Sequence, residues 1–232
     1  MLRAKILKIE SSLSAREAKN LLLKAEYVED VGRGIVLSDA TSSEISGRYF
    51  EKNIYIEEVF HPIEGMTELE RYNFFDIAFN INFELGLITL LSSLTKKNSF
   101  ITFLGMCLNF KASIVDIKID PLKLIEKINA NFSQVNLRKL VYSNIQIDNS
   151  TKASIAISSL DDARTNDKFL SIIESQTPSR LSFEGIYNNK RISCSISSNC
   201  SIALSNNCSE EVLSMLANEV ASSWHPANGM KK

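Results

Sequence analysis

The stretch Ser113–Ser197, which opens with SIVDIKIDPLKLIEKI (113–128), decides the predicted fold of this chain. Isoleucine and valine alternate with charged residues at its start, a pattern typical of a strand. Asp120 and Pro121 then provide an N-cap and a proline at the first helical position. Apolar residues at helical spacing follow, so the opening of the stretch predicts a strand and then a helix whose buried stripe is Leu124, Ile125, Ile128 and Phe132.

The middle of the stretch predicts two strands and a second helix. Apolar residues alternate with polar ones over Leu137–Ile147 and again over Ser154–Ser158, as expected for half-buried strands. An apolar run with helical spacing begins at Asp161 or Asp162, and Pro178 ends it. This second helix would connect the strand pair to the segment that follows.

The end of the stretch is a predicted hairpin. Arg180–Tyr187 and Lys190–Ser197 flank Asn188 and Asn189, a natural tight-turn dipeptide, and Ser209 can cap a terminal helix. Two successive strand–helix–strand units most simply form an antiparallel sheet with both helices on one face. We therefore expect an α+β fold whose second half is a split βαβ, ferredoxin-like domain.

The first half of the chain mixes strand and helix patterns. Leu2–Ile9 suits an opening strand, and Ala15–Glu26 carries apolar residues at helical spacing. Phe, Ile and polar residues alternate strongly over Tyr72–Phe83, whereas Asn98–Asn109 has the spacing of a helix. These patterns predict a mixed N-terminal α+β region that contains aromatic-rich strands.

The length of 232 residues, 44% of them apolar, allows two small domains with real cores. We expect an N-terminal α+β domain over residues 1–111, a split βαβ domain with a terminal helix over 112–223, and a disordered tail over 224–232. No stretch reaches about 18 apolar residues, and the start lacks the pattern of a signal peptide. The expected protein is cytoplasmic, without membrane insertion.

Charge and cysteine content narrow the function classes. The chain has 26 basic and 27 acidic residues, a net charge of −1, so a nucleic-acid site must be a local patch. Its four cysteines lack the paired spacing of a structural zinc site, and we expect free thiols. The sequence predicts neither a bound metal nor a cofactor.

Motifs for catalysis are almost absent. The chain has no phosphate-binding loop, dinucleotide fingerprint, hydrolase elbow or metalloprotease helix, which favours a non-enzymatic binding protein. One alternative is a Mg²⁺-dependent nuclease. Asp116 and Lys118 lie two residues apart in a predicted strand, so both project from one face, where carboxylates hold Mg²⁺ and lysine stabilises phosphate charge. The alternative without a catalytic role is that Asp116 and Lys118 lie on the solvent-exposed face of an amphipathic strand.

Two basic pairs suggest contact with DNA or RNA. Arg138 and Lys139 lie in a predicted strand, and Lys190 and Arg191 follow the hairpin turn. If these four side chains converge on one face of the sheet, they form a phosphate-binding surface. The competing interpretation is a set of dispersed, solvated cations. A further alternative is a subunit of a larger complex or a homo-oligomer, in which a predicted edge strand at Ile192–Ser197 or the aromatic strand pairs with another chain.

The order of elements resembles that of phage exclusion proteins of the RexA type. The resemblance rests on the helix led by Pro121, the hairpin Leu181–Ser197, the terminal helix from Ser209, and the upstream segment FHPIEGMT (60–67). It implies a non-enzymatic, DNA-binding, oligomer-forming sensor or regulator in an antiphage or prophage system. It assigns no site residue to this chain.

Overall fold

The computed structural model describes residues 1–63, 65–91, 96–146, 149–160, 162–163, 176–205 and 209–224. Contacts divide the chain into unit 1, which is Met1–Lys8 with Val115–Lys232, and unit 2, which is Ile9–Ile114. The sequence analysis placed a domain boundary after residue 111 and assigned the first strand to the N-terminal domain. The opening residues instead belong with the C-terminal half of the chain.

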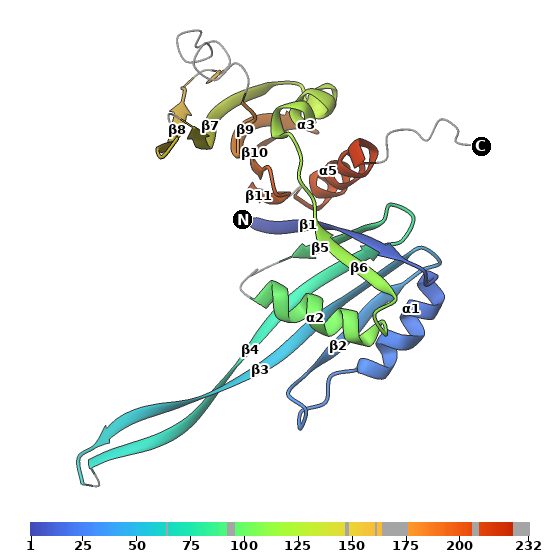
Figure 1. Ribbon diagram of the computed structural model, residues 1–232, viewed down its shortest axis with the longest axis vertical. Coiled ribbons are helices and arrows are strands. Elements are labelled where there is room, and N and C mark those ends of the chain that lie inside the picture. The colour runs from blue at the N-terminus through green and yellow to red at the C-terminus, as the bar shows by residue number, and fades with distance from the viewer. Residues whose placement is uncertain are drawn as a thin grey trace. The chain divides into compact units, whose positions relative to one another are not determined.

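Unit 2 contains a four-stranded antiparallel sheet in the order β2-β3-β4-β5, with two α-helices (Figure 1). Ser14 and Glu17 form a capping box at the start of the first helix, which explains why it begins there. The elements are α1 (Ala15–Leu22), the 3₁₀ turn η1 (Leu23–Ala25), β2 (Arg33–Ala40), β3 (Glu44–His61), β4 (Gly65–Asn82), β5 (Leu87–Leu91) and α2 (Lys97–Cys107).

Aromatic rings join α2 to the sheet of unit 2. The ring centroid of Phe100 lies 5.5 Å from that of Tyr49 and 5.2 Å from that of Phe79. All three side chains are buried, and the alternation along β4 that the sequence analysis identified puts Ile77, Phe79 and Ile81 in this core. The expected helix over Asn98–Asn109 is confirmed as α2.

A half-buried polar cluster ties the start of α2 to β3. The carboxylate of Glu51 accepts hydrogen bonds from the hydroxyls of Ser99 and Tyr49 and from Lys96 Nζ, which lies 3.0 Å away. Burial alone would raise the pKa of Glu51, but these hydrogen bonds outweigh it and hold the pKa below the usual value. Desolvation raises the pKa of Tyr49 to about 12. The cluster is therefore satisfied as an ionised carboxylate with neutral donors and one lysine.

Two strands of unit 2 continue beyond the rest of its sheet as a two-stranded arm. β3 and β4 pair over their whole length, from Glu44 with Asn82 to His61 with Gly65. β2 accompanies β3 only as far as Glu51, and β5 accompanies β4 only from Ala78 onward. We call the segment in which only β3 and β4 pair, Lys52–His61 with Gly65–Phe74, the arm (Figure 1).

Unit 1 contains an antiparallel sheet in the order β1-β11-β10-β9-β7-β8 (Figure 1). Asp120 accepts hydrogen bonds from the backbone of Leu122 and Lys123, so the predicted N-cap is confirmed. β1 and β6 each run across the chain boundary between the units. The elements are β1 (Leu2–Ser11), β6 (Ala112–Asp116), α3 (Pro121–Ile128), the 3₁₀ turn η3 (Asn129–Asn131), β7 (Val135–Gln146), β8 (Lys152–Ser158), β9 (Arg180–Tyr187), β10 (Lys190–Ser197), β11 (Ser201–Ser205) and α5 (Ser209–Trp224).

One face of this sheet forms the core of unit 1 with the apolar stripes of α3 and α5. Phe132, which follows α3, packs its ring edge-on against Phe183 of β9, with centroids 5.6 Å apart. A Cβ on Gly185 would lie 2.8 Å from that ring, so glycine is required for the close approach. The buried stripe predicted for α3 is confirmed, and α5 contributes Val212, Leu213, Leu216 and Val220.

The predicted split βαβ fold is wrong. The structure is mostly antiparallel sheet, with eleven strands, 53% strand and 25% helix over the described residues, rather than a small ferredoxin-like sheet with two crossover helices. One long-range pairing and one weak local pattern account for the difference. The first strand pairs with β11, and β11 itself lies in a Ser-, Asn- and Cys-rich run that lacks a strong strand pattern. Most of the expected second helix, from Asp161 to Pro178, lies outside the described residues.

The structure tests several local predictions separately from the topology. The hairpin Arg180–Tyr187 with Lys190–Ser197 has the predicted bounds, with Asn188 and Asn189 both at positive φ in its turn. The expectation that Ile192–Ser197 is an edge strand is wrong, because β10 lies between β9 and β11. α5 ends at Trp224, and the expected tail beyond it is outside the described residues. No helix in the described part of the chain is long and apolar enough to span a membrane.

Candidate nucleic-acid interface

The sheet of unit 1 has a second face, on the side away from its buried core, which we call the open face. Directly opposed residues in an antiparallel sheet project to the same side. One row of such residues crosses all six strands, from β1 to β8, and its members are basic or small: Arg3, Ala203, Ser195, Ser182, Lys139 and Ser158.

A bulge in β7 explains why two consecutive basic residues share this face. The register shifts between Leu137 and Lys139 against β9, so Arg138 and Lys139 together oppose Ser182. Leu137 and Leu140 on either side are buried in the core. Without the extra residue, strand alternation would have turned either Arg138 or Lys139 toward the helices.

Arg180 adds a further cation to the open face. It opposes Ser197 of β10 and lies two residues before Ser182, and therefore on the same side of β9. It lines a hollow of 450 Å³ together with Val141, Ser143, Ser179, Ser197, Ser198, Asn199 and Ser201. Hydroxyl groups and one guanidinium therefore dominate this hollow, a set of groups suited to phosphate oxygens.

A carboxylate holds the other two arginines of this face. Glu184 Oε2 lies 2.8 Å from a guanidinium nitrogen of Arg138 and 2.7 Å from one of Arg191. Hydrogen bonds from Arg191 and then Arg138 lower the pKa of Glu184, so it stays ionised at neutral pH. The three side chains line a hollow of 200 Å³ with Gln134, Asn136, Gly185 and Ile186.

The structure brings three of the four predicted contact residues together. Arg138, Lys139 and Arg191 lie on the open face, as the register shows. Lys190 has the parity of Ile192, which is buried in the core, so it projects from the opposite side of β10. Sequence reasoning did not assign Arg3 and Arg180 to the site.

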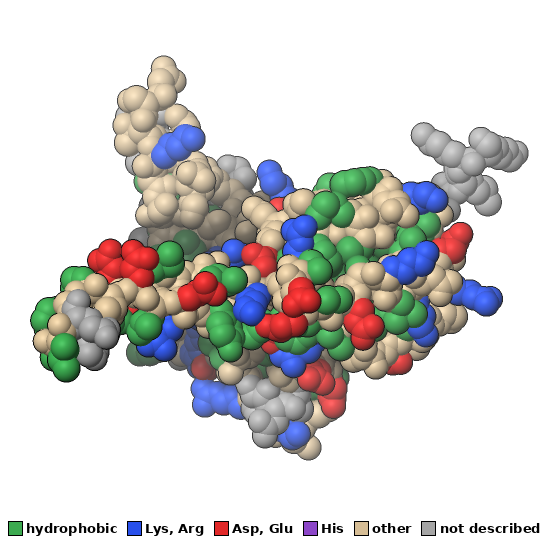
Figure 2. Space-filling view, turned by 90° about the horizontal axis from the view of Figure 1, so that it is seen from below, with side chains coloured by type: hydrophobic (Ala, Val, Ile, Leu, Met, Phe, Trp, Pro, Cys, Tyr) green, Lys and Arg blue, Asp and Glu red, His purple; other side chains and the backbone are tan. Residues whose placement is uncertain are grey.

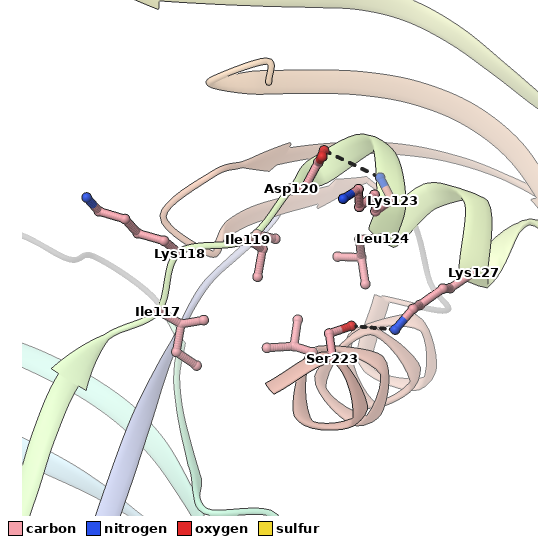
Figure 3. Close-up of a pocket in the computed structure, with 9 residues that line it drawn as sticks. Ile117, Lys118, Ile119, Asp120, Lys123, Leu124, Lys127 and Ser223 are labelled. Atoms are coloured by element: carbon pink, nitrogen blue, oxygen red, sulfur yellow. Dashed lines mark hydrogen bonds between the residues drawn. The ribbon is translucent and has the colours of Figure 1, made fainter. Parts of the chain in front are cut away.

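Of the two residues of the nuclease alternative, only Asp116 lies in a strand, because β6 ends there and not at Ile119 as the sequence predicted. The carboxylate of Asp116 lies 2.9 Å from Lys5 Nζ, and Lys5 is only 3% exposed and also donates to the backbone carbonyl of Asn199. Lys118 follows β6 in the loop that leads to α3 and points away from the other side chains there (Figure 3). Among the described residues, no group of three or more His, Cys, Asp or Glu side chains could hold a metal ion.

A second basic region lies on the helix side of unit 1. A hollow of 270 Å³ is bounded by the β6–α3 loop, α3 and α5, and its lining includes Lys118, Lys123 and Lys127 (Figure 3). Lys127 Nζ donates to Ser223 Oγ at 2.8 Å, and the Asp120 carboxylate already caps α3. Ile117, Ile119, Leu124 and Val220 form an apolar floor. The lysines of this region are suitable for control variants that remove charge on the side opposite the open face.

The two thiols of unit 1 that lie among the described residues are free and buried. Cys194 and Cys200 form no disulfide, as the sequence analysis expected for them, and Cys107 of unit 2 is also free. Burial raises the pKa of Cys194, and it raises that of Cys200 to about 12. These cysteines have the properties of small apolar core residues rather than of nucleophiles.

Comparison with known proteins adds no family assignment to this geometry. No protein-family model matches the chain, and no curated protein matches it.

Proposed function

We propose that this chain is a non-enzymatic nucleic-acid-binding protein whose open face contacts the sugar–phosphate backbone of DNA or RNA. The observation that carries the proposal is a row across six strands that begins with Arg3, contains Lys139 and is flanked by Arg180. Within the described residues, none of these three cations forms an ion pair. Cations whose charge no carboxylate cancels are available to neutralise phosphates.

The spacing of these charges suits an extended polyanion. Neighbouring strands are about 4.8 Å apart, so Arg3 on β1 and Lys139 on β7, four strands away, are separated by about 19 Å. That distance spans several phosphates of one strand. The serines between them are short hydroxyl donors that let a backbone approach the sheet closely, and such donors commonly contact phosphate and sugar oxygens.

The composition of the open face favours binding without base recognition. The row from Arg3 to Ser158 contains no aromatic side chain on which a base could stack. The expected interaction is therefore electrostatic, sensitive to salt and tolerant of sequence. This function agrees with the class of protein that the resemblance to RexA-type proteins implies. The proposal therefore includes a role as a cytoplasmic regulator or sensor in an antiphage or prophage system.

The test compares two double variants that remove the same charge from opposite sides of unit 1. Lys139→Gln with Arg180→Gln alters the open face, and Lys118→Gln with Lys123→Gln alters the helix side. Binding is measured by fluorescence anisotropy with labelled single- and double-stranded DNA and RNA at about 50 mM salt, with and without Mg²⁺, and the same samples are run on a denaturing gel.

We expect the open-face variant to bind at least about tenfold more weakly than wild type and the helix-side variant to bind normally. Loss of binding only in the helix-side variant would contradict the proposal. Mg²⁺-dependent cleavage that Asp116→Asn abolishes would favour the nuclease instead. That alternative has weaker support, because Lys5 engages the Asp116 carboxylate.

A further inference from the structure

The arm of unit 2 presents one strongly apolar face. Cross-strand partners on that face are Lys52 with Phe74, Ile54 with Tyr72, Ile56 with Glu70, Glu58 with Glu68, and Phe60 with Met66. Its six apolar side chains are between 45% and 69% exposed: Ile54, Ile56, Phe60, Met66, Tyr72 and Phe74. We call this side the apolar arm face. Apolar and acidic side chains gather on the arm (Figure 2).

An uncovered ribbon of this kind is poorly stable by itself. A two-stranded hairpin in water is marginal unless a further strand or a packed layer covers its apolar side. β2 and β5 stop before the arm begins, and among the described residues the contacts from the rest of unit 2 lie at its base, where Tyr27 packs edge-on against Phe74 and Glu29 pairs with Lys52. Exposed apolar side chains in one contiguous patch are typical of a surface that another protein covers.

The charges on the apolar arm face indicate what kind of surface can cover it. Glu58 and Glu68 are directly opposed, a destabilising arrangement for like charges, and Glu70 lies on the same face. In the described part of the chain, none of these three carboxylates has a cationic partner. The outer half of the apolar arm face therefore repels a nucleic-acid backbone and requires a cation from its occupant.

A second copy of the same face supplies that cation. If two arms pack face to face and antiparallel, with the two-fold axis between the Ile54–Tyr72 and Ile56–Glu70 pairs, the Glu58–Glu68 pair of one copy lies over the Lys52–Phe74 pair of the other. The Phe60–Met66 pair then covers Phe50 at the base of the partner's arm. Lys52 Nζ already lies 2.7 Å from Glu29 and can donate to a second carboxylate, since an ammonium has three donors.

The area of such an interface is adequate for a reversible dimer. Six side chains that each lose roughly 100 Å² of exposed surface bury about 600 Å² per copy, or about 1,200 Å² in total. This value lies at the lower end of the range for specific protein interfaces. The expected complex is therefore a reversible dimer whose dissociation constant sedimentation equilibrium can measure.

We propose that the apolar arm face is a homodimer interface, in which the arms of two copies pack face to face and antiparallel. The proposal is independent of the nucleic-acid function, because it uses only residues of the arm and its base. It commits to a self-complementary occupant, and it fixes which residues lie near the symmetry axis and which lie far from it.

The first test removes apolar surface from one face of the arm at a time. Ile56→Thr with Phe60→Thr alters the apolar arm face, and Tyr55→Thr with Leu69→Thr alters the opposite face and serves as the matched control. Threonine keeps a β-branched side chain, so the ribbon is retained. Sedimentation equilibrium of the full chain should give a dimer for wild type and control, with association at least about a hundredfold weaker for the first variant.

The second test locates the symmetry axis by cross-linking of single introduced cysteines with a bismaleimide whose flexible spacer is about 10 Å long, because face-to-face sheets lie too far apart for a direct disulfide. Ile56→Cys lies beside the proposed axis, whereas the tip residue in Phe60→Cys would lie far from its equivalent, since ten residues of strand separate its level from that of Phe50. We expect the bismaleimide to cross-link the first variant into a dimer and to leave the second uncross-linked. A wild-type chain that is monomeric at all concentrations, a dimer insensitive to Ile56→Thr with Phe60→Thr, or preferential cross-linking of Phe60→Cys would each overturn the proposal.

Discussion

Substitution of Glu184 by glutamine should strengthen nucleic-acid binding, because this carboxylate cancels charge on the open face. Glu184 lies within 2.8 Å of guanidinium nitrogens of both Arg138 and Arg191. Its hydrogen-bonded arginines lower its pKa, so it is ionised at every pH at which binding would be measured. Glutamine removes that negative charge but keeps a carbonyl oxygen that either arginine can still contact.

The size of the effect follows from Coulomb's law. A unit charge about 6 Å from a phosphate contributes about 0.7 kcal/mol at the dielectric constant of water. Two phosphates near the pair of arginines therefore give about 1.4 kcal/mol, or tenfold tighter binding at low salt. Screening over a Debye length of about 10 Å reduces the gain to about three- to fourfold near 0.1 M salt.

The assay is fluorescence anisotropy with a labelled DNA duplex and a labelled single strand, run in parallel for wild type, Glu184→Gln and Glu126→Gln. Glu126 of α3 is exposed on the helix side of unit 1, so the control makes the same change in net charge at a distance from the open face. We expect a gain in affinity for Glu184→Gln alone. An unchanged or weaker affinity for Glu184→Gln, or an equal gain in the control, would refute the reasoning.

Three further predictions concern stability and reactivity. Gly185→Ala should lower the free energy of unfolding by about 1–3 kcal/mol, because the added methyl group would overlap the ring of Phe132. Gly105→Ala in α2 should not lower it, because the nearest atoms to an added Cβ there are 3.8 Å away. Denaturant titration of both variants measures the difference. The lowered pKa of Glu51 contributes stability that is present above its unfolded value near 4.5 and is lost as pH falls through its folded value; Glu51→Gln should therefore flatten the acid side of the stability profile of unit 2, and an unchanged profile would exclude this role. Buried Cys194 and Cys200 should resist alkylation at pH 8 until the protein unfolds, and mass spectrometry that finds rapid native labelling at either would contradict their assignment to the core.

Local structure followed from residues that act over short distances. Asp120 and Pro121 specify the start of α3, and the Asn188–Asn189 dipeptide specifies the hairpin turn, because capping and positive φ depend on the residues themselves. Alternation along the last part of β4 similarly placed Ile77, Phe79 and Ile81 in the core of unit 2. These features required no knowledge of which strands are neighbours.

The topology was not predictable in the same way. β1 pairs with β11 through the register of Leu2 with Leu204, across some two hundred residues, and no periodicity reports such a partner. The short strand β11 carries Ser and Ala on one face and only Ile202 and Leu204 on the other, so its pattern does not stand out from the Ser-, Asn- and Cys-rich run around it. The hydrophobic effect favours burial of Ile202 and Leu204 beside any neighbouring strand, so it does not specify β1 as the partner.

The candidate interface was predictable in part. Arg138, Lys139 and Arg191 were candidates from the sequence, but the bulge that keeps Arg138 and Lys139 on one face is a property of the pairing with β9. Arg180 was missed, although it has opposite parity to the core residue Leu181 and could have been placed on a polar face from that alternation. The charge cancellation by Glu184 required the three-dimensional register of three strands.

The salt dependence of nucleic-acid affinity tests the central claim most directly. Affinity is measured between about 50 and 200 mM salt for wild type and for Lys139→Gln with Arg180→Gln. Each neutralised phosphate contributes about −0.9 to the slope of log affinity against log salt, so the three cations with no ion pair in the described residues predict a slope of about −3 for wild type and about −1 for the variant. No binding by wild type at the lowest salt, or identical slopes for the two proteins, would contradict the account.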